Sequence, residues 1–336
     1  MMRTLLLGLL WLASPSVAGA VDYSLVPRVA PKLTKVQAAA GDGRVAIGTG
    51  VMVAADTVVT NCHVTRDAKH IEIWSGGQRF VVSGQSANVD RDLCALFTSG
   101  MPDLVVPIAP GRPRIGSSVL GVGYSGGLEL RFGIGQIRAL HDYDGGAVIQ
   151  TDAVFDSGAS GGGLFNDQGE LIGFVTFRHR GQTKDVYHFS VPAAWSNPLL
   201  EVKRAKDVGV LGSEAAFWQR PLDRQPFFLQ AVALQAEARW TELRELALRW
   251  TRSEPDNGTA WTALSVASVK LDRPGPGMEA GRRAVLLHPD DPNAWLSFAA
   301  ACRAAGEVKG VEDARAALAR LNPRYLDELD RAQPSP

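Results

Sequence analysis

The sequence has little cysteine, no excess of charge of either sign and no long apolar run in its main part. Its three cysteines, Cys62, Cys94 and Cys302, are too few for a fold held together by a disulfide framework. Basic and acidic residues number 35 each, so no global charge would draw the chain to nucleic acid or to an anionic membrane. Beyond residue 20 no stretch is long and apolar enough to span a bilayer, so we expect no membrane span in the mature form.

The first 20 residues have the pattern of a secretory signal peptide. Arg3 supplies a basic start, a mostly apolar run extends from Leu5 to Ala13, and Ala18-Gly19-Ala20 ends the segment as a cleavage site. A membrane anchor is the alternative, but the run falls short of the roughly 20 apolar residues that a spanning helix needs. We therefore expect a periplasmic or secreted protein after removal of residues 1–20.

Length and composition predict two domains. At 336 residues the chain exceeds the usual size of a single core. Between residues 21 and 200, many short β-like runs are separated by glycine without long helical patterns, which favours an antiparallel barrel or sandwich. After Leu200 these runs stop, and alanine, leucine, arginine and glutamate dominate. We expect a linker over residues 201–220 and a helical domain over residues 221–331.

A serine flanked by glycines lies in the segment Gly158-Ala159-Ser160-Gly161-Gly162-Gly163. Nucleophilic acyl transfer needs such a loop, because residues without a β-carbon let a substrate carbonyl approach and permit strained turns. The amides of Gly158 and Ser160 can be aimed at one point, which would form an oxyanion hole. A glycine-rich surface loop is the alternative for this stretch taken alone.

Two upstream motifs supply the other groups of a catalytic triad. His63 follows a strand-like run, and Asp92 begins another, Leu93-Cys94-Ala95-Leu96-Phe97. With Ser160 they give the chain order His, Asp, Ser of the chymotrypsin arrangement. A structural histidine and an aspartate that merely starts a strand are the alternatives, but three coincident motifs in this order favour a triad. Asp90 is the alternative acid.

These motifs resemble the three signatures of trypsin-like serine proteases, and most closely those of the bacterial HtrA/Deg branch. The matching segments are Thr60-Asn61-Cys62-His63-Val64, Asp92-Leu93-Cys94-Ala95-Leu96 and Gly158-Ala159-Ser160-Gly161-Gly162. The resemblance covers about residues 43–200 and implies an all-β, chymotrypsin-like double barrel with the active site between the barrels. It also implies that His63 is the general base, Asp92 orients it, Ser160 attacks the carbonyl, and the Gly158 and Ser160 amides hold the oxyanion.

The chain also departs from those relatives. Ala159 stands where activatable trypsins carry an aspartate, so zymogen activation by a new N-terminus is not expected. HtrA relatives usually carry PDZ modules after the protease domain, and this chain does not. Cys62 and Cys94 each lie near a triad member, and the implied fold brings them close enough to form a disulfide; two small buried free cysteines are the alternative. The resemblance implies no metal and no cofactor.

The resemblance also places the primary specificity pocket. Its lining is expected from the segment before the serine and from two later strands, at Val154, Phe155, Thr176 and His188. No acidic residue occupies the base of this pocket, so a preference for lysine or arginine is not supported. We expect a small or medium apolar side chain in the substrate.

The C-terminal part repeats with a period of 34 residues. Prolines recur at this interval, at Pro221, Pro255, Pro289 and Pro323, and so do aromatics, at Phe227, Trp261 and Trp295. The period resembles that of tetratricopeptide repeats, an all-α solenoid whose concave groove binds peptides or partner proteins. About three repeats fit, with the turn inside the middle copy expected at Pro274-Gly275-Pro276-Gly277. A purely structural appendage is the alternative.

Together these features predict an exported serine endopeptidase that cleaves protein substrates through an acyl-enzyme, with helical repeats that recruit substrate or a partner protein. The first alternative is a catalytically silent protease fold that serves as a binding scaffold. The second is a serine hydrolase acting on esters or cell-envelope amides, which would share the glycine-serine loop but normally has a strand-turn-helix around it.

Overall fold

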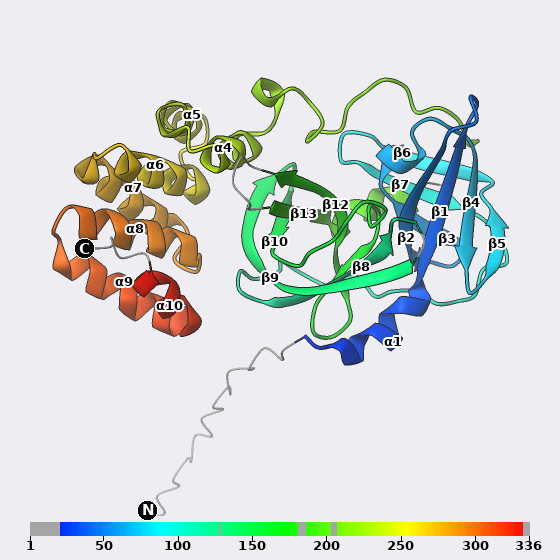
Figure 1. The fold of residues 1–336 in the computed structure, drawn as a ribbon, viewed down its shortest axis with the longest axis horizontal. Helices are drawn as coiled ribbons and strands as arrows, with labels where there is room; N and C mark the ends of the chain where they lie inside the picture. Colours follow the sequence, from blue (N-terminus) through cyan, green and yellow to red (C-terminus); the bar gives the residue numbers. More distant parts are fainter. Residues whose placement is uncertain (1–20, 128, 181–185, 203–206, 332–336) are drawn as a thin grey trace, which may run out of the picture.

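The structure is a computed structural model that describes residues 21–127, 129–180, 186–202 and 207–331. The expected signal peptide, residues 1–20, lies outside the described residues. Within the described part of the chain, no helix combines the length and the apolar character needed to cross a membrane. Three units follow one another along the chain: a β-sheet, a β-barrel and a stack of helices (Figure 1).

The first unit is an antiparallel sheet of seven strands. It contains β1 (Leu33–Ala40), β2 (Val45–Ala54), β3 (Thr57–Thr60), β4 (Ala68–Ser75), β5 (Gln78–Val81), β6 (Gly84–Asn88) and β7 (Leu93–Phe97). The strand order is β5-β4-β1-β2-β3-β7-β6. The short helices α1 (Val26–Val29) and α2 (Cys62–Thr65) precede β1 and follow β3. The ends of β3 and β7 therefore lie side by side, with Thr60 opposite Cys94.

The second unit is a closed antiparallel barrel with the strand order β10-β13-β12-β11-β8-β9. Its strands are β8 (Ser118–Ser125), β9 (Glu129–Tyr143), β10 (Gly146–Thr151), β11 (Gly163–Phe165), β12 (Leu171–Arg180) and β13 (Val186–Pro192). Asp144 and Gly145, with φ of 47° and 72°, form the tight turn between β9 and β10, as two-residue hairpins require. Helix α3 (Asn197–Leu200) follows the barrel.

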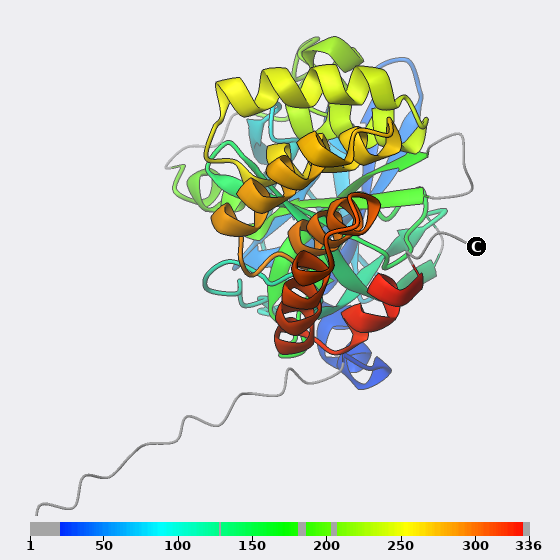
Figure 2. The ribbon, with the colours of Figure 1, turned by 90° about the vertical axis from the view of Figure 1, so that its left-hand side faces the viewer.

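The third unit consists of helices arranged as three antiparallel pairs and a final helix. The pairs are α4 (Phe227–Ala236) with α5 (Trp240–Ser253), α6 (Gly258–Lys270) with α7 (Pro274–Leu287), and α8 (Pro292–Ala304) with α9 (Val308–Leu321), followed by α10 (Arg324–Arg331). Figure 2, viewed from the side of the helices, shows the pairs stacked in chain order against the barrel. The sequence-based prediction of a β-barrel domain followed by a helical region is therefore confirmed.

Structural details of the helical region recur every 34 residues. The indole N–H of Trp261 donates to the carbonyl of Pro255, and that of Trp295 donates to the carbonyl of Pro289, both at 2.8 Å. The turn between the two helices of each pair contains one residue in the left-handed conformation, namely Ala238, Asp272 and Gly306. The prediction of a turn at Pro274-Gly275-Pro276-Gly277 is wrong, because these residues begin α7. Proline is well suited to a first helical turn, where its missing N–H has no intrahelical partner.

Replacing Ala238 with glycine should stabilise the protein. Ala238 has a φ of 54°, whereas the equivalent Gly306 has a φ of 72° and no atom within 4 Å of the place that a β-carbon would take. Left-handed backbone strains an alanine but not a glycine, so Ala238→Gly should raise the free energy of unfolding by about 0.5–1 kcal/mol. Gly306→Ala is the reciprocal control and should lower it by a similar amount. Thermal unfolding checks both, and a lower melting temperature for Ala238→Gly would contradict the argument.

The core is continuous from the barrel to the first helices. A single hydrophobic cluster contains Phe189 of β13, Phe217 of the segment before the helices, and Phe228 of α4. Phe217 is fully buried, and its ring lies 5.0 Å from that of Tyr143 at the end of β9. The boundaries predicted at residues 200 and 220 stay predictions, but Ala216 and Phe217, inside the expected linker, are fully buried.

Candidate active site

His63 and Asp92 are joined by two hydrogen bonds at the meeting point of β3 and β7. The Nδ1 atom of His63 lies 2.6 Å from Oδ2 of Asp92, and the backbone N–H of His63 donates to Oδ1 at 2.8 Å. The backbone carbonyl of Asp92 accepts from the Cys62 amide and from the Asn61 side chain. The Asp92 side chain is fully buried, whereas the His63 side chain is 22% exposed. The imidazole is thus fixed on its Nδ1 edge by the carboxylate.

Asp92 has an unusual backbone conformation. Its φ is 58°, in the left-handed region where residues other than glycine are strained. The turn directs the carboxylate inward, toward α2, and lets β7 start at the next residue. Asp90, the alternative acid, points elsewhere: its carboxylate forms an ion pair with Arg220 and is 41% exposed. Of the two aspartates, only Asp92 contacts His63 among the described residues.

A disulfide joins the two segments that carry this pair. Cys62 precedes His63 and Cys94 lies two residues after Asp92; their sulfur atoms are bonded and their Cα atoms are 5.0 Å apart. Of the two alternatives that the sequence left open, a disulfide or two free cysteines, the structure has the disulfide, and Cys302 is a free, buried cysteine. The bond holds α2 against β7 independently of the hydrogen bonds of Asp92.

The Ser160 loop is held in place by Thr49 of β2. The Thr49 amide donates to the carbonyl of Ser160, and its hydroxyl donates to the carbonyl of Gly158, both at 2.8 Å. Gly158 and Gly161 have φ of 92° and 84°, conformations that glycine adopts without strain. Neither the Gly158 nor the Ser160 amide donates a hydrogen bond to any described residue. Two N–H groups are therefore available to a ligand at this loop.

The hydroxyl of Ser160 donates to the carbonyl of Thr176 at 3.4 Å. Among the described residues, no hydrogen bond joins Ser160 to His63. The two sides of the site are nevertheless linked, because the hydroxyl of Thr176 accepts from the side chain of Asn61 at 3.2 Å. The structure thus brings Ser160, Thr176 and the His63 helix together at the junction of the sheet and the barrel.

The four residues predicted to line a specificity pocket lie in different surroundings. Phe155 and His188 are in contact, with ring centroids 4.5 Å apart. Burial lowers the pKa of His188 below its usual value, and the positive charge of Arg178 lowers it further. Thr176 is buried and its hydroxyl donates to the carbonyl of Phe174, while Val154 is 64% exposed. Phe155 and His188 are thus neighbours, and the pocket assignment stays a prediction.

Sequence reasoning missed two residues that support this site. Thr49 stands between glycines in β2, and that small-residue context is the only signal that the strand passes close to another backbone. Trp218 donates its indole N–H to Oδ2 of Asp92 at 3.0 Å, although it lies 126 residues away in sequence. Nothing in the sequence around Trp218 connects it to the motif of Asp92.

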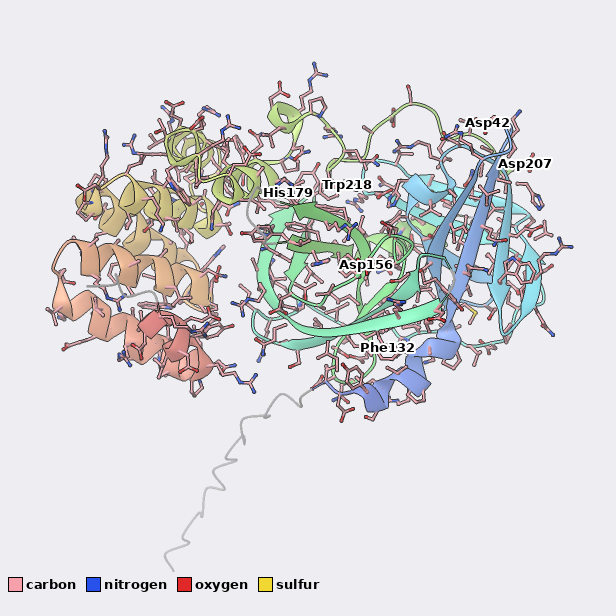
Figure 3. All side chains as sticks on the ribbon, in the orientation of Figure 1. Asp42, Phe132, Asp156, His179, Asp207 and Trp218 are labelled. Carbon is pink, nitrogen blue, oxygen red and sulfur yellow. A yellow bond between two sulfur atoms is a disulfide. The ribbon has the colours of Figure 1, made fainter. Side chains whose placement is uncertain are left out.

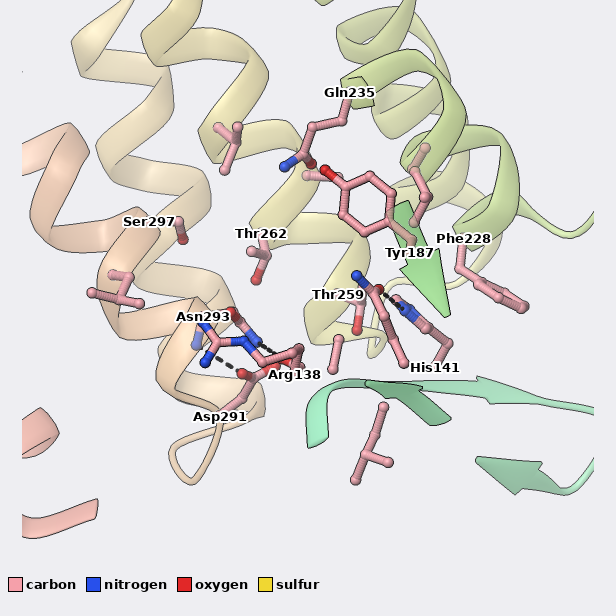
Figure 4. Close-up of a pocket in the computed structure, with 18 of the residues that line it drawn as sticks. Arg138, His141, Tyr187, Phe228, Gln235, Thr259, Thr262, Asp291, Asn293 and Ser297 are labelled. Atoms are coloured by element: carbon pink, nitrogen blue, oxygen red, sulfur yellow. Dashed lines mark hydrogen bonds between the residues drawn. The ribbon is translucent and has the colours of Figure 1, made fainter. Parts of the chain in front are cut away.

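A second candidate site is the cavity between the barrel and the helices. It measures about 440 Å³ and is lined by β9, β10 and β13 on one side and by α4, α6 and α8, the first helix of each pair, on the other. Figure 4 shows His141 and Tyr187 on the barrel side, facing Thr262 and Asn293 of the helices. The first helices of the three pairs are therefore turned toward the chain's own barrel.

His141 makes the contact between these two parts sensitive to pH. Its ring is stacked on that of Phe228 at 4.7 Å, and Nε2 lies 2.9 Å from the side-chain oxygen of Gln150. Burial lowers the pKa of His141 from 6.5 to about 4. Because the unfolded chain takes up this proton near pH 6.5 and the folded chain does not, stability should fall as the pH drops below that value, by roughly 2 kcal/mol between pH 7 and pH 5.

The variant His141→Phe, which keeps the ring stack and cannot titrate, tests this. Unfolding by urea at several pH values should show the wild type losing more stability than the variant between pH 7 and pH 5. Other groups titrate equally in both proteins, so the difference between their losses of unfolding free energy isolates the contribution of His141. Parallel losses in the two proteins would mean that His141 does not set this pH dependence.

Residues 48–174 match the family model of the trypsin-like peptidase domain. This range includes His63, Asp92 and Ser160. The fold, a seven-stranded sheet followed by a closed barrel, is consistent with the match to a trypsin-like peptidase domain, and a C-terminal helical region follows it.

Among individual proteins, the chain is similar to bacterial serine endoproteases. It is 31% identical over 193 residues to the serine endoprotease DegS of Escherichia coli K12, covering 51% of this chain and 53% of DegS. It is 34% identical over 189 residues to a probable periplasmic serine endoprotease DegP-like of Buchnera aphidicola, covering 50% of this chain and 39% of that protein. A DegP-like protein of Chlamydia pneumoniae is 29% identical over 164 residues, covering 46% of this chain and 33% of its own length. The chain thus spans a third to about half of these relatives.

One solved structure supports the fold. The active form of the Rv3671c protease from M. tuberculosis aligns with a TM-score of 0.51 at 22% identity, covering 62% of this chain and 100% of that one. At this identity the likeness concerns the fold alone.

Proposed function

We propose that this chain is an exported serine endopeptidase that cleaves protein substrates through a His63–Asp92–Ser160 triad. The observation that carries the proposal is the pairing of a fully buried Asp92 with the Nδ1 edge of His63, beside a glycine loop with two free amides. The match to the trypsin-like peptidase domain and the similarity to proteins named serine endoproteases support it. Export is supported by relatives named periplasmic and by the expected leader.

Each residue has a role that follows from its position. Asp92 holds His63 with Nε2 directed away from the carboxylate, so Nε2 is the nitrogen left to accept the proton of Ser160. Ser160 attacks the scissile carbonyl and forms an acyl-enzyme, which water then hydrolyses. The Gly158 and Ser160 amides stabilise the negative oxygen of each tetrahedral intermediate. For this to occur, the Ser160 hydroxyl must rotate from the Thr176 carbonyl to His63.

One observation favours a second candidate, a catalytically silent protease fold that serves as a scaffold. The Ser160 hydroxyl is bonded to Thr176 and not to His63 in this structure. In trypsin-like enzymes without substrate this catalytic hydrogen bond is often long or absent and forms only in the complex, so the same geometry suits a resting enzyme.

Labelling with a fluorophosphonate, which reacts only with an activated serine, separates the two. We expect the mature protein after Ala20 to be labelled, and Ser160→Ala and His63→Ala to remain unlabelled. Labelling of wild type alone would also exclude a role for any other serine. A folded wild type that takes no label, even after incubation with protein substrates, would overturn the endopeptidase and leave the scaffold.

We also propose that the helical region consists of divergent tetratricopeptide repeats that recruit substrate or a partner protein. The recurring contacts of Trp261 and Trp295 and the cavity lined by all three first helices support this. Thr262→Trp would fill the cavity, and Arg283→Trp, on the second helix of its pair, is the control. We expect Thr262→Trp to slow cleavage of a full-length protein substrate but not of a short peptide. If Thr262→Trp cleaved both substrates at the rates of the control variant, a recruiting role would be contradicted.

A further inference from the structure

The segment between the barrel and the helices is anchored along the edge of the candidate active site. The Leu211 amide donates to the carbonyl of Arg66, just past α2, and the side chain of Gln85 donates to the carbonyl of Gly209. The Phe217 amide then donates to the carbonyl of Asp90 at 3.0 Å. Residues 207–220 are therefore held by the same loops that carry His63 and Asp92, and Figure 3 shows Trp218 where this segment passes from the sheet to the barrel.

Trp218 contacts both sides of the site. Its indole N–H donates to Oδ2 of Asp92, the oxygen that also faces Nδ1 of His63. Its ring meets that of His63 edge-on, with centroids 5.5 Å apart and an interplanar angle of 85°. The Trp218 ring also stacks in parallel on the ring of Phe177, with centroids 4.8 Å apart and an interplanar angle of 7°. Phe177 follows Thr176, the residue whose carbonyl accepts from Ser160.

A buried carboxylate needs donors on both oxygens, because it loses its water on burial. Oδ1 of Asp92 accepts from the His63 amide, and Oδ2 accepts from His63 Nδ1 and from Trp218. The hydroxyl of Thr176, on β12 of the barrel, is not available to Asp92, because it donates to the carbonyl of Phe174. Trp218 is thus the one donor to the carboxylate, among the described residues, that does not come from His63 itself.

We propose that Trp218 is a positioning residue of this active site. Its indole N–H fixes the Asp92 carboxylate, and its ring packs against the imidazole of His63. The proposal deepens the serine endopeptidase function and rests on it for its catalytic consequence. It means that the catalytic unit includes a residue of the segment that follows the barrel, 126 residues after Asp92 in the sequence. The segment that leads to the helices then completes the site instead of only connecting two domains.

The test is Trp218→Phe in the full chain, because phenylalanine keeps the stack on Phe177 and the edge on His63 but removes the donor. Trp261→Phe is the matched control: it deletes an indole N–H bonded to a carbonyl at 2.8 Å, far from the site. Without this donor the carboxylate is held less firmly against His63, so we expect kcat on a peptide substrate to fall by about 10-fold or more while KM stays unchanged.

A second readout does not depend on activity. With one donor removed, Asp92 carries more negative charge toward His63 and should hold a proton on the imidazole more strongly. The hydrogen bond between Nδ1 of His63 and Oδ2 of Asp92 should therefore shorten, so the NMR resonance of the proton between these atoms should move downfield in Trp218→Phe and stay unchanged in Trp261→Phe.

The two readouts separate the two proposals. A resonance of the His63 Nδ1 proton that is the same in wild type, Trp218→Phe and Trp261→Phe overturns the positioning role, whatever the activity. If this resonance shifts in Trp218→Phe but fluorophosphonate does not label the wild type, the endopeptidase is overturned and the contact of Trp218 with Asp92 stands. Equal kcat values for Trp218→Phe and Trp261→Phe in a labelled enzyme would also count against the positioning role.

Discussion

Asp92→Asn should lower kcat on a peptide substrate by about 10⁴-fold while leaving the fold and KM nearly unchanged. Asparagine has the shape of aspartate, so the hydrogen bond from the His63 amide can persist. An amide nitrogen facing Nδ1 of His63 would, however, donate where the carboxylate accepts. The imidazole would then carry its proton on Nε2, the atom that must take the proton of Ser160, and it would lose the charge that stabilises its protonated form.

Asp90→Asn is the matched control for this prediction. Asp90 lies two residues away, and its carboxylate is partly exposed and paired with Arg220 rather than with His63. A partly exposed ion pair contributes little, so the control should keep most of the wild-type kcat. Steady-state kinetics on all three proteins decide the question. A large loss for Asp90→Asn with a small one for Asp92→Asn would transfer the role of the acid to Asp90.

Removing the disulfide should cost about 3–4 kcal/mol of stability. The bond between Cys62 and Cys94 closes a loop with a sequence separation of 32, and closing a loop of this length in the unfolded chain gives that value. Cys62→Ala/Cys94→Ala should therefore melt about 10 °C below the wild type. The loss should be accompanied by lower activity, since Cys62 begins the helix that carries His63.

Reductant provides the control, because it acts on the bond without changing the sequence. Cys302 is present in both proteins and its effect cancels. A thiol-free phosphine should lower the melting temperature of the wild type to near that of the double variant and leave the variant unchanged. A wild type whose melting temperature is insensitive to the phosphine, with thiol titration showing full reduction, would mean that the bond contributes little.

Much of the fold could be predicted from local pattern, and the exceptions have physical causes. The run Leu93–Phe97 is apolar throughout and is indeed the buried strand β7. The strand β1, Leu33–Ala40, was not predicted, because its end is rich in alanine, which has little preference for strands. It is a strand because β2 and β4 pair with it on both sides. Tertiary pairing of this kind leaves no signal in the segment itself.

The candidate site divides in the same way. His63, Asp92 and Ser160 are predicted site residues because each lies in a short motif whose residue types the proposed chemistry requires. The sequence left the disulfide open, since proximity of two cysteines in the implied fold does not decide whether they are bonded. Thr49 and Trp218 could not be predicted, because they act through contacts made by chain segments distant in sequence. A tryptophan between a buried phenylalanine and a glutamine has the ordinary pattern of a packed linker.

The orientation of the helices has a consequence for what they can bind. The helices α4, α6 and α8 face β9, and the helical region is held there by the ion pair of Arg138 with Glu328 of α10 and by the bond from Asn293 of α8 to the Arg138 carbonyl. Under the proposed recruiting role, a long peptide would have to displace the barrel before it could lie along these helices. The free energy of the contact would then be subtracted from the affinity of the peptide. A segment short enough for the cavity would avoid this cost, so the proposed ligands would be distinguished by length before they are distinguished by sequence.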